Sequence, residues 1–440
     1  MNSTPNRQVF YGWKVVTALL VMLTFATGLS FYNHAVILNA LAQQPAFTVQ
    51  SASIAVSLFF LSGGVAGLWV ARWVNDYDPR FCISFGALIC GASLAGLALI
   101  TKVWQLYVLY LIFGVGFSAS NLVPATTLVT RWFHKKRAMA LSIASTGLSL
   151  GGVIITPICA VLVESLGLGR AAPVMGLMYV AGVVPVSLIW LRPSPESMGL
   201  QPDDDQTSEN ETQGTLSSDP FGETSSNSAG DQVAQKVASQ PVKSKLPAGV
   251  SFRDARRGRL FWAMSTAYIF LMMAQVGGIS HQYGLARELL DESQTALVVA
   301  ILPIASIVGR LAGGWVIEQL SIRSFAIGMM ILQVVSLLLL SGGYNPFTLC
   351  LGLASFGITV GNLLMLQPLL IAEAFGVREY PRIFAVSNFM SSWGTASGPA
   401  ALGLVYATSS NLYGAAYLLA AAAGLAGLAL FLAGGPLKRS

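Results

Sequence analysis

Twelve runs of about twenty mostly apolar residues alternate with short polar segments along the 440-residue chain. An α-helix needs a run of this length to cross the hydrocarbon core of a bilayer, because each residue advances the helix by about 1.5 Å. The pattern therefore predicts an all-α polytopic membrane protein. The expected helices cover residues 13–33, 50–71, 81–100, 104–127, 138–163, 171–191, 258–282, 293–317, 324–343, 346–370, 382–404 and 411–434.

A long polar segment divides the twelve predicted helices into two sets of six. It is rich in Ser, Gln, Asp, Glu and Gly and has too few apolar residues to bury a core. The predicted organisation is an N-terminal six-helix bundle over residues 1–192, a flexible cytoplasmic linker over 193–257, and a C-terminal six-helix bundle over 258–440. The segment 67–80 resembles 310–323, and Asn121 recurs as Asn362 at nearly the same offset. The two bundles are therefore expected to be pseudo-symmetric repeats, with substrate at their interface.

Composition and charge agree with a membrane protein. Hydrophobic residues make up 54% of the chain and charged residues only 10%, whereas about a quarter of a soluble domain is charged. The net charge of +6 does not indicate a nucleic-acid partner, because 21 of the 25 Lys and Arg residues fall on one side of the predicted topology and three on the other. This bias predicts a cell (inner or plasma) membrane protein with both termini cytoplasmic.

The chemistry-bearing residue types indicate neither an enzyme nor a cofactor. The four cysteines lie singly in apolar runs and suggest neither a metal site nor a disulfide framework. No nucleophile–base–acid set appears in the polar segments. We expect a monomer in the lipid bilayer.

Polar side chains gather in the first, fourth, seventh and tenth predicted helices. Polar groups facing lipid would lack hydrogen-bond partners, so these helices are expected to surround a central polar cavity. The alternative is that the amides only join helices to one another. The residues concerned are Asn33, His34, Asn121, Gln275, His281, Gln282, Asn362 and Gln367.

Arg310 is the one charged residue inside an apolar run. It precedes Glu318, where the run ends, by about 12 Å of helix, a depth that approaches the middle of the membrane. An embedded charge is costly, so it indicates a functional site. The structural alternative is that Arg310 pairs with Glu318 or caps backbone carbonyls.

Several motifs resemble those of the major facilitator superfamily, and more narrowly its oxalate/formate antiporter and monocarboxylate transporter branch. They are Tyr11-Gly12-Trp13-Lys14, Arg131-Trp132-Phe133, Gly309-Arg310-Leu311 and Ala372-Glu373-Ala374-Phe375-Gly376. The resemblance implies two bundles that alternate around a midplane site. It also implies that Arg310 pairs with a substrate carboxylate, a role that suits the planar guanidinium.

Three departures from the family pattern narrow the expectation. Asn75 stands where the family carries an acid after the second helix, and Asp76 follows it. Ser306 stands where some proton symporters carry an acid. The eleventh helix lacks the second cation of oxalate exchangers. With one buried cation, a dianion would leave an uncompensated charge in a medium of low dielectric. We therefore favour a small monocarboxylate over oxalate.

The residues expected to bind substrate are Arg310, Asn121, Gln275, Asn362, Tyr32 and Asn33. Those expected to serve gating or coupling are His281, His34, Asp76, Glu318, Arg80 and Arg323. Both histidines are expected where a helix meets water, and coupling of transport to a proton through either stays open, as do symport, exchange and uniport. The competing interpretations are a drug/proton antiporter and a non-transporting membrane sensor with the same fold.

Overall fold

The computed structural model describes residues 10–133, 136–201, 250–342, 345–376, 379–410 and 412–435. Six helical spans form the N-terminal bundle, three of them interrupted. They are Tyr11–Thr27 (α1), Gly28–Tyr32 (η1) and His34–Ala42 (α2); Val49–Asp76 (α3); Pro79–Gly96 (α4); Val103–Ser120 (α5) and Leu122–Trp132 (α6); Arg137–Leu150 (α7), Gly151–Ile155 (η2) and Thr156–Leu166 (α8); and Leu168–Trp190 (α9).

Six more spans form the C-terminal bundle. They are Arg259–Arg287 (α13), Glu292–Val299 with Ile301–Gln319 (α14 and α15), Ile322–Ser341 (α16), Pro346–Phe375 (α17), Tyr380–Thr408 (α18) and Tyr413–Ala433 (α19). Eleven of the spans in the described part of the chain are long and apolar enough to cross a membrane. The twelfth is α18, whose serines reduce its hydropathy but which packs lengthwise against α13 and α3. The twelve predicted helices are all present.

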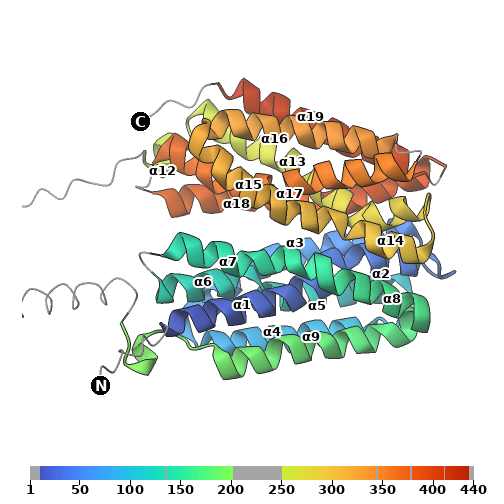
Figure 1. Cartoon of the computed structure of the whole chain (residues 1–440), viewed down its shortest axis with the longest axis horizontal. Helices are drawn as coiled ribbons and strands as arrows, with labels where there is room; N and C mark the ends of the chain where they lie inside the picture. Colours follow the sequence, from blue (N-terminus) through green and yellow to red (C-terminus); the bar gives the residue numbers. More distant parts are fainter. Residues whose placement is uncertain are drawn as a thin grey trace, which may run out of the picture.

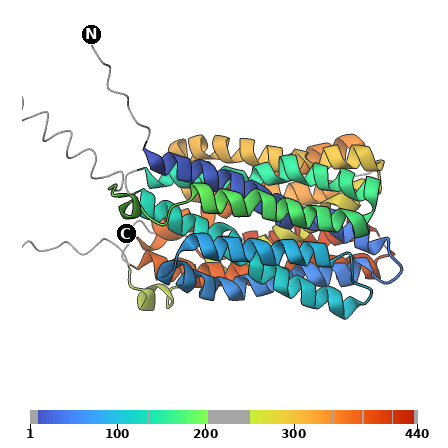
Figure 2. The same cartoon turned by 90° about the horizontal axis from the view of Figure 1, so that it is seen from below.

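The two sets of helices form separate bundles that lie side by side (Figure 1). One large apolar core lies wholly within residues 15–191 and a second within residues 255–431. A third cluster joins the bundles, because Tyr32, Ala35 and Val36 pack with residues of α13 and α17. Figure 2 shows the helices of both bundles running nearly parallel along the long axis of the molecule.

The bundles are joined by hydrogen bonds at the end opposite the termini. There the Ala400 N–H donates to Ser57 Oγ at 2.9 Å, and Ser53 Oγ lies 3.4 Å from His281 Nε2. Among the described residues, the other hydrogen bonds between the bundles lie near mid-helix, at Arg310 and Ser306. The structure is therefore closed at the end opposite the termini.

Two π-helical segments and one break interrupt the spans near the middle of the molecule. The π-helical segments η1 and η2 contact each other through Gly28 and Gly151. Asn121 separates α5 from α6 with φ −121° and ψ −133°, outside the helical region. Single-turn π segments frequently lie at functional sites, and these three places surround the interface between the bundles.

Most of the predicted linker, residues 202–249, lies outside the described residues. Its last part is docked rather than free. The short helix Phe252–Ala255 (α12) packs on the C-terminal bundle, where the Phe252 N–H donates to the Glu379 carboxylate at 2.8 Å. The Arg382 guanidinium lies 4.8 Å from the centre of the Phe252 ring.

Candidate functional site

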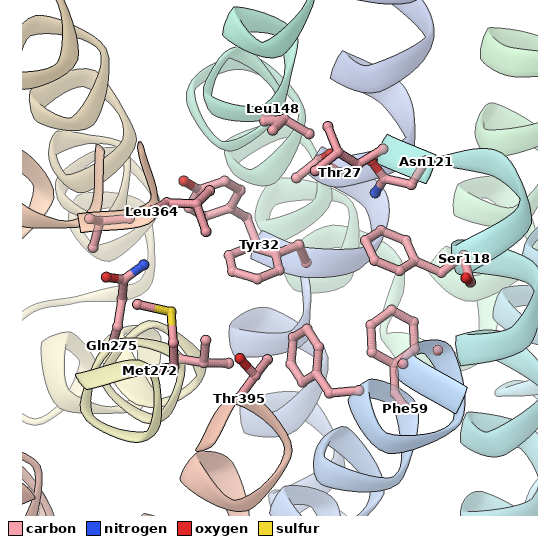
Figure 3. A pocket seen from close by; sticks show the side chains of 18 of the residues that line it. Thr27, Tyr32, Phe59, Ser118, Asn121, Leu148, Met272, Gln275, Leu364 and Thr395 are labelled. Atoms are coloured by element: carbon pink, nitrogen blue, oxygen red, sulfur yellow. The ribbon is translucent and has the colours of Figure 1, made fainter. Parts of the chain in front are cut away.

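A cavity of about 310 Å³ lies between the two bundles near mid-helix (Figure 3). In Figure 3, Tyr32 lies between Gln275 and Leu364 of the C-terminal bundle and Asn121 and Ser118 of the N-terminal bundle. The complete lining is Thr27, Phe31, Tyr32, Phe59, Phe60, Gly63, Gly64, Phe117, Ser118, Asn121, Leu122, Val123, Leu148, Ser149, Met272, Gln275, Val276, Arg310, Val360, Leu364 and Thr395.

Arg310 is the only charged residue among those described that line the cavity, and it is half-buried. Its guanidinium donates to the Gly361 carbonyl at 3.4 Å, the Ser145 carbonyl at 3.3 Å and Ser149 Oγ at 3.5 Å. All three acceptors are neutral, and their distances exceed the 2.7–2.9 Å (approximately) of a charge-assisted hydrogen bond. The cavity therefore carries a positive charge that its own lining does not compensate.

The interruptions in the helices bring polar side chains to this charge. Tyr32 ends η1 and lines the same cavity as Arg310, and Ser149 stands two residues before η2. Arg310 belongs to the C-terminal bundle, whereas Tyr32, Ser145 and Ser149 belong to the N-terminal bundle. The guanidinium thus links the two bundles at the edge of the cavity.

Asn121 and Gln275 are amides whose side-chain oxygens have no hydrogen-bond partner in the described part of the chain. Both residues line the cavity, both are less than 5% exposed, and Oδ1 of Asn121 and Oε1 of Gln275 are unpartnered. A buried polar group without a partner is destabilising. These amides are therefore available to a molecule in the cavity. Four of the six residues predicted to bind substrate, Arg310, Asn121, Gln275 and Tyr32, are brought together here.

Asn33 and Asn362 do not line the cavity. The Asn362 amide donates to the Gly309 and Ile358 carbonyls, both at 2.9 Å, and so ties α17 to α15. The Asn33 amide donates to the Leu29 carbonyl at 3.4 Å and contacts Met175 Sδ on α9 at 3.2 Å. For these two residues the geometry fits the alternative that the amides join helices.

Both histidines are buried, so the expectation that they lie where a helix meets water is wrong. The His34 ring is packed among Phe59, Phe60, Tyr110 and Phe113, and neither of its nitrogens has a hydrogen-bond partner among the residues that the structure describes. His281 Nε2 lies 3.1 Å from the Pro399 carbonyl and 3.4 Å from Ser53 Oγ. His281 therefore lies at the closed contact between the bundles, where a gating role remains a prediction.

The other predicted gating residues lie at the end of the molecule that carries the termini. Arg80 forms an ion pair with Asp78 at 2.7 Å. Partial burial opposes ionisation of Asp78, but the hydrogen bonds and charge of Arg80 hold the pKa of that carboxyl below its ordinary value. Arg323 donates to the Gly435 carbonyl and lies 5.8 Å from the centre of the Phe431 ring. The side chains of Asp76 and Glu318 lie outside the described residues.

Ser145, Ser149 and the aromatic lining residues were not predicted from the sequence. Serine in an apolar helix is common, and its hydroxyl usually returns to the backbone of its own helix. The phenylalanines of the cavity are ordinary members of apolar runs. Among the described residues, no group of three or more His, Cys, Asp or Glu side chains could hold a metal ion.

The chain matches the family model of the Major Facilitator Superfamily over residues 20–290 and 269–440. An MFS-type transporter of Gibberella moniliformis is 29% identical over 196 residues, which cover 43% of this chain and 45% of that relative. The first alignments thus span less than half of the relatives' own length. Monocarboxylate transporter 7 of Homo sapiens is 23% identical over 466 residues, covering 96% of this chain and 86% of that protein.

Solved structures share the fold. A crystal structure of the peptide transporter POT in complex with alafosfalin superposes with a TM-score of 0.67 at 14% sequence identity, over 97% of this chain and 96% of that one. The relatives that align along most of the chain include monocarboxylate transporters, as the motifs predict. Because the family model covers both six-helix bundles, the chain belongs to the Major Facilitator Superfamily.

Proposed function

We propose that this protein is a secondary active transporter of a small organic anion, a monocarboxylate, which binds in the cavity with Arg310 as its counter-charge. The observation that carries the proposal is the positive charge of Arg310, beside which the other described residues that line the cavity are neutral. A superfamily transporter needs a midplane site that both bundles share. Arg310 supplies such a site with a preference for anions.

The hydrogen bonds of Arg310 favour a carboxylate as its partner. Its three present acceptors are neutral and lie 3.3–3.5 Å away. A carboxylate can accept two parallel hydrogen bonds from the same guanidinium at about 2.7–2.9 Å, each roughly twice as strong as a neutral one. A monocarboxylate would also leave the occupied cavity neutral, whereas a dianion would leave one negative charge without a partner.

The position of Arg310 connects binding to movement of the bundles. The guanidinium of α15 holds Ser145 and Ser149 of α7, so an anion that replaces these acceptors loosens one link between the bundles. Among the described residues, the remaining hydrogen bonds between the bundles are the nearby contact of Ser149 with Ser306 and the two at the end opposite the termini. If the termini are cytoplasmic, as the distribution of Lys and Arg predicts, this structure is the inward-facing state of alternating access.

The similarity to monocarboxylate transporters supports the same substrate class, since two such relatives align along most of the chain. The drug/proton antiporter alternative is less well supported. That class usually carries an acid in the membrane, and no described residue lining the cavity is acidic. Proton symport and anion exchange are both compatible with the site.

The test is uptake into proteoliposomes containing the purified full-length chain. Labelled monocarboxylates, dicarboxylates and the uncharged amide of one monocarboxylate are compared, with and without a pH gradient and with and without an internal anion. We expect uptake of monocarboxylates that Arg310→Gln abolishes. The matched control is Arg170→Gln, because Arg170 is exposed at the start of α9 and away from the cavity.

Three results separate the alternatives. Uptake that requires a pH gradient indicates symport, and uptake that requires an internal anion indicates exchange. Retention of monocarboxylate uptake in Arg310→Gln, or transport of the uncharged amide as fast as the acid, would refute Arg310 as the counter-charge.

A further inference from the structure

The wall of the cavity that belongs to the N-terminal bundle is aromatic. We call Phe31, Phe59, Phe60 and Phe117 the aromatic wall; they come from η1, α3 and α5. The ring centres of Phe59 and Phe60 are 5.1 Å apart, those of Phe59 and Phe117 4.9 Å, and those of Phe31 and Phe60 5.6 Å. These spacings fall in the range of favourable contacts between aromatic rings, about 4.5–7 Å.

Three rings of the aromatic wall are accessible, whereas the fourth, Phe59, is 0% exposed. Nearby rings of the same bundle, Tyr110 and Phe113, are 1% exposed, as expected for a packed core. In contrast, Phe31, Phe60 and Phe117 remain partly accessible while lining the cavity. The opposite side of the cavity adds the apolar side chains Met272, Val276, Val360 and Leu364. Arg310 thus stands at the edge of a largely apolar space.

The size of the cavity fits one ring with its acid group. A cavity of about 150 Å³ lined by apolar side chains can hold benzene, and this one is about 310 Å³. A two- or three-carbon acid would engage Arg310 and leave the aromatic wall against water.

We infer that the preferred substrate is an aryl monocarboxylate, whose carboxylate pairs with Arg310 and whose ring packs on the aromatic wall. This inference rests on the proposed function and adds the substrate's apolar body to it. Burying a side chain the size of phenylalanine favours binding by about 10- to 100-fold. Phenylacetate should therefore bind about 10- to 100-fold more tightly than acetate, from which it differs by the phenyl group alone.

The experiment uses the full-length protein in proteoliposomes and three labelled acids: acetate, phenylacetate and cyclohexylacetate. The cyclohexyl acid has an apolar body of similar size without a π system. Ring-to-ring contacts favour the aryl acid by a further 2- to 10-fold, approximately. We expect half-saturation concentrations to rise from phenylacetate through cyclohexylacetate to acetate.

Two variants test whether the aromatic wall causes the preference for phenylacetate over acetate. Phe60→Ala and Phe117→Ala should raise the half-saturation concentration for phenylacetate about tenfold more than that for acetate. Acetate uptake in the same preparation reports that each variant is folded and inserted. The control is Phe81→Ala, because Phe81 is exposed on α4 and does not line the cavity.

The outcomes separate this inference from the proposed function. Acetate transported as well as phenylacetate, with both lost in Arg310→Gln, overturns the aryl preference and leaves the counter-charge intact. Phenylacetate and cyclohexylacetate with equal half-saturation also overturns it, as does phenylacetate uptake that neither phenylalanine variant changes. Uptake of none of the three acids overturns both proposals.

Discussion

The contact between the two π-helical segments is a sensitive point of the structure, and Gly28→Ala tests it. A Cβ atom on Gly28 would lie 2.6 Å from Ile155 Cβ, 2.7 Å from the Gly151 carbonyl oxygen and 2.9 Å from Gly151 Cα. Nonbonded carbon atoms prefer about 3.5–4.0 Å. Two of these three atoms are backbone, so the new methyl group must push η1 and η2 apart by about 1 Å.

The free-energy cost of Gly28→Ala follows from these short distances. An added methyl group in a packed core costs about 1–3 kcal/mol, and replacing glycine by alanine in a helix returns at most about 1 kcal/mol. The separation also reaches the site, because Tyr32 is four residues after Gly28 and Ser149 two residues before Gly151. We expect Gly28→Ala to lower the unfolding temperature and to raise the half-saturation concentration of the transported anion.

The measurements are thermal unfolding of the purified protein in detergent and uptake of the same labelled monocarboxylate into proteoliposomes. The matched control is Gly328→Ala in α16, where a Cβ atom would meet nothing within 4 Å. The control should match or exceed the wild-type unfolding temperature, because alanine favours the helix. A Gly28→Ala protein as stable as the wild type, with unchanged half-saturation, would show that the contact is not tight.

Three further predictions concern residues outside the cavity. Asn362→Leu should lower the unfolding temperature, because the amide joins α17 to α15, and should leave the half-saturation concentration of the substrate near the wild-type value. A large rise in the half-saturation concentration with normal stability would instead place Asn362 at the substrate. Partial burial raises the pKa of Glu288, although the hydrogen bond from the Tyr413 N–H opposes the rise. The stability that the protonated carboxyl contributes is therefore lost as pH increases through that raised pKa. Unfolding temperatures measured against pH should fall less steeply above the ordinary glutamate pKa in Glu288→Gln than in the wild type, and identical slopes would contradict this. Glu379→Ala should speed tryptic cleavage next to α12, since the carboxylate holds the Phe252 N–H, and unchanged digestion would show that other contacts suffice.

The sequence predicts the architecture well because the bilayer restricts the possibilities. Spans of about twenty apolar residues must form helices in lipid, and all twelve expected spans are present. The interruptions were not predicted. A π-helical turn at Gly28–Tyr32 or a break at Asn121 depends on close contacts with other helices, and the sequence of one helix does not contain those contacts.

The depth of a residue in the membrane follows from its sequence position, but the direction in which it faces does not. Tyr32 and Asn33 are neighbours, yet Tyr32 lines the cavity and Asn33 faces α9. One residue turns an α-helix by about 100°, and η1 ends at this position. Asn121 and Asn362 occupy corresponding positions in the two halves, yet only Asn121 reaches the cavity. The repeat therefore predicted the helices that surround the site better than the side chains that enter it.

Polar residues revealed the charge of the site, whereas its apolar surface could not be recognised from the sequence. The chain has 22 phenylalanines, and both an exposed ring such as Phe81 and a cavity ring such as Phe60 lie in apolar runs. Phe81 is 65% exposed on the outside of α4, and Phe60 lines the space beside Arg310. An anion of any shape can satisfy the guanidinium, so discrimination among monocarboxylates must come from the surface around it. If the proposed site is correct, substrate preference is decided by residues that look like ordinary core in the sequence.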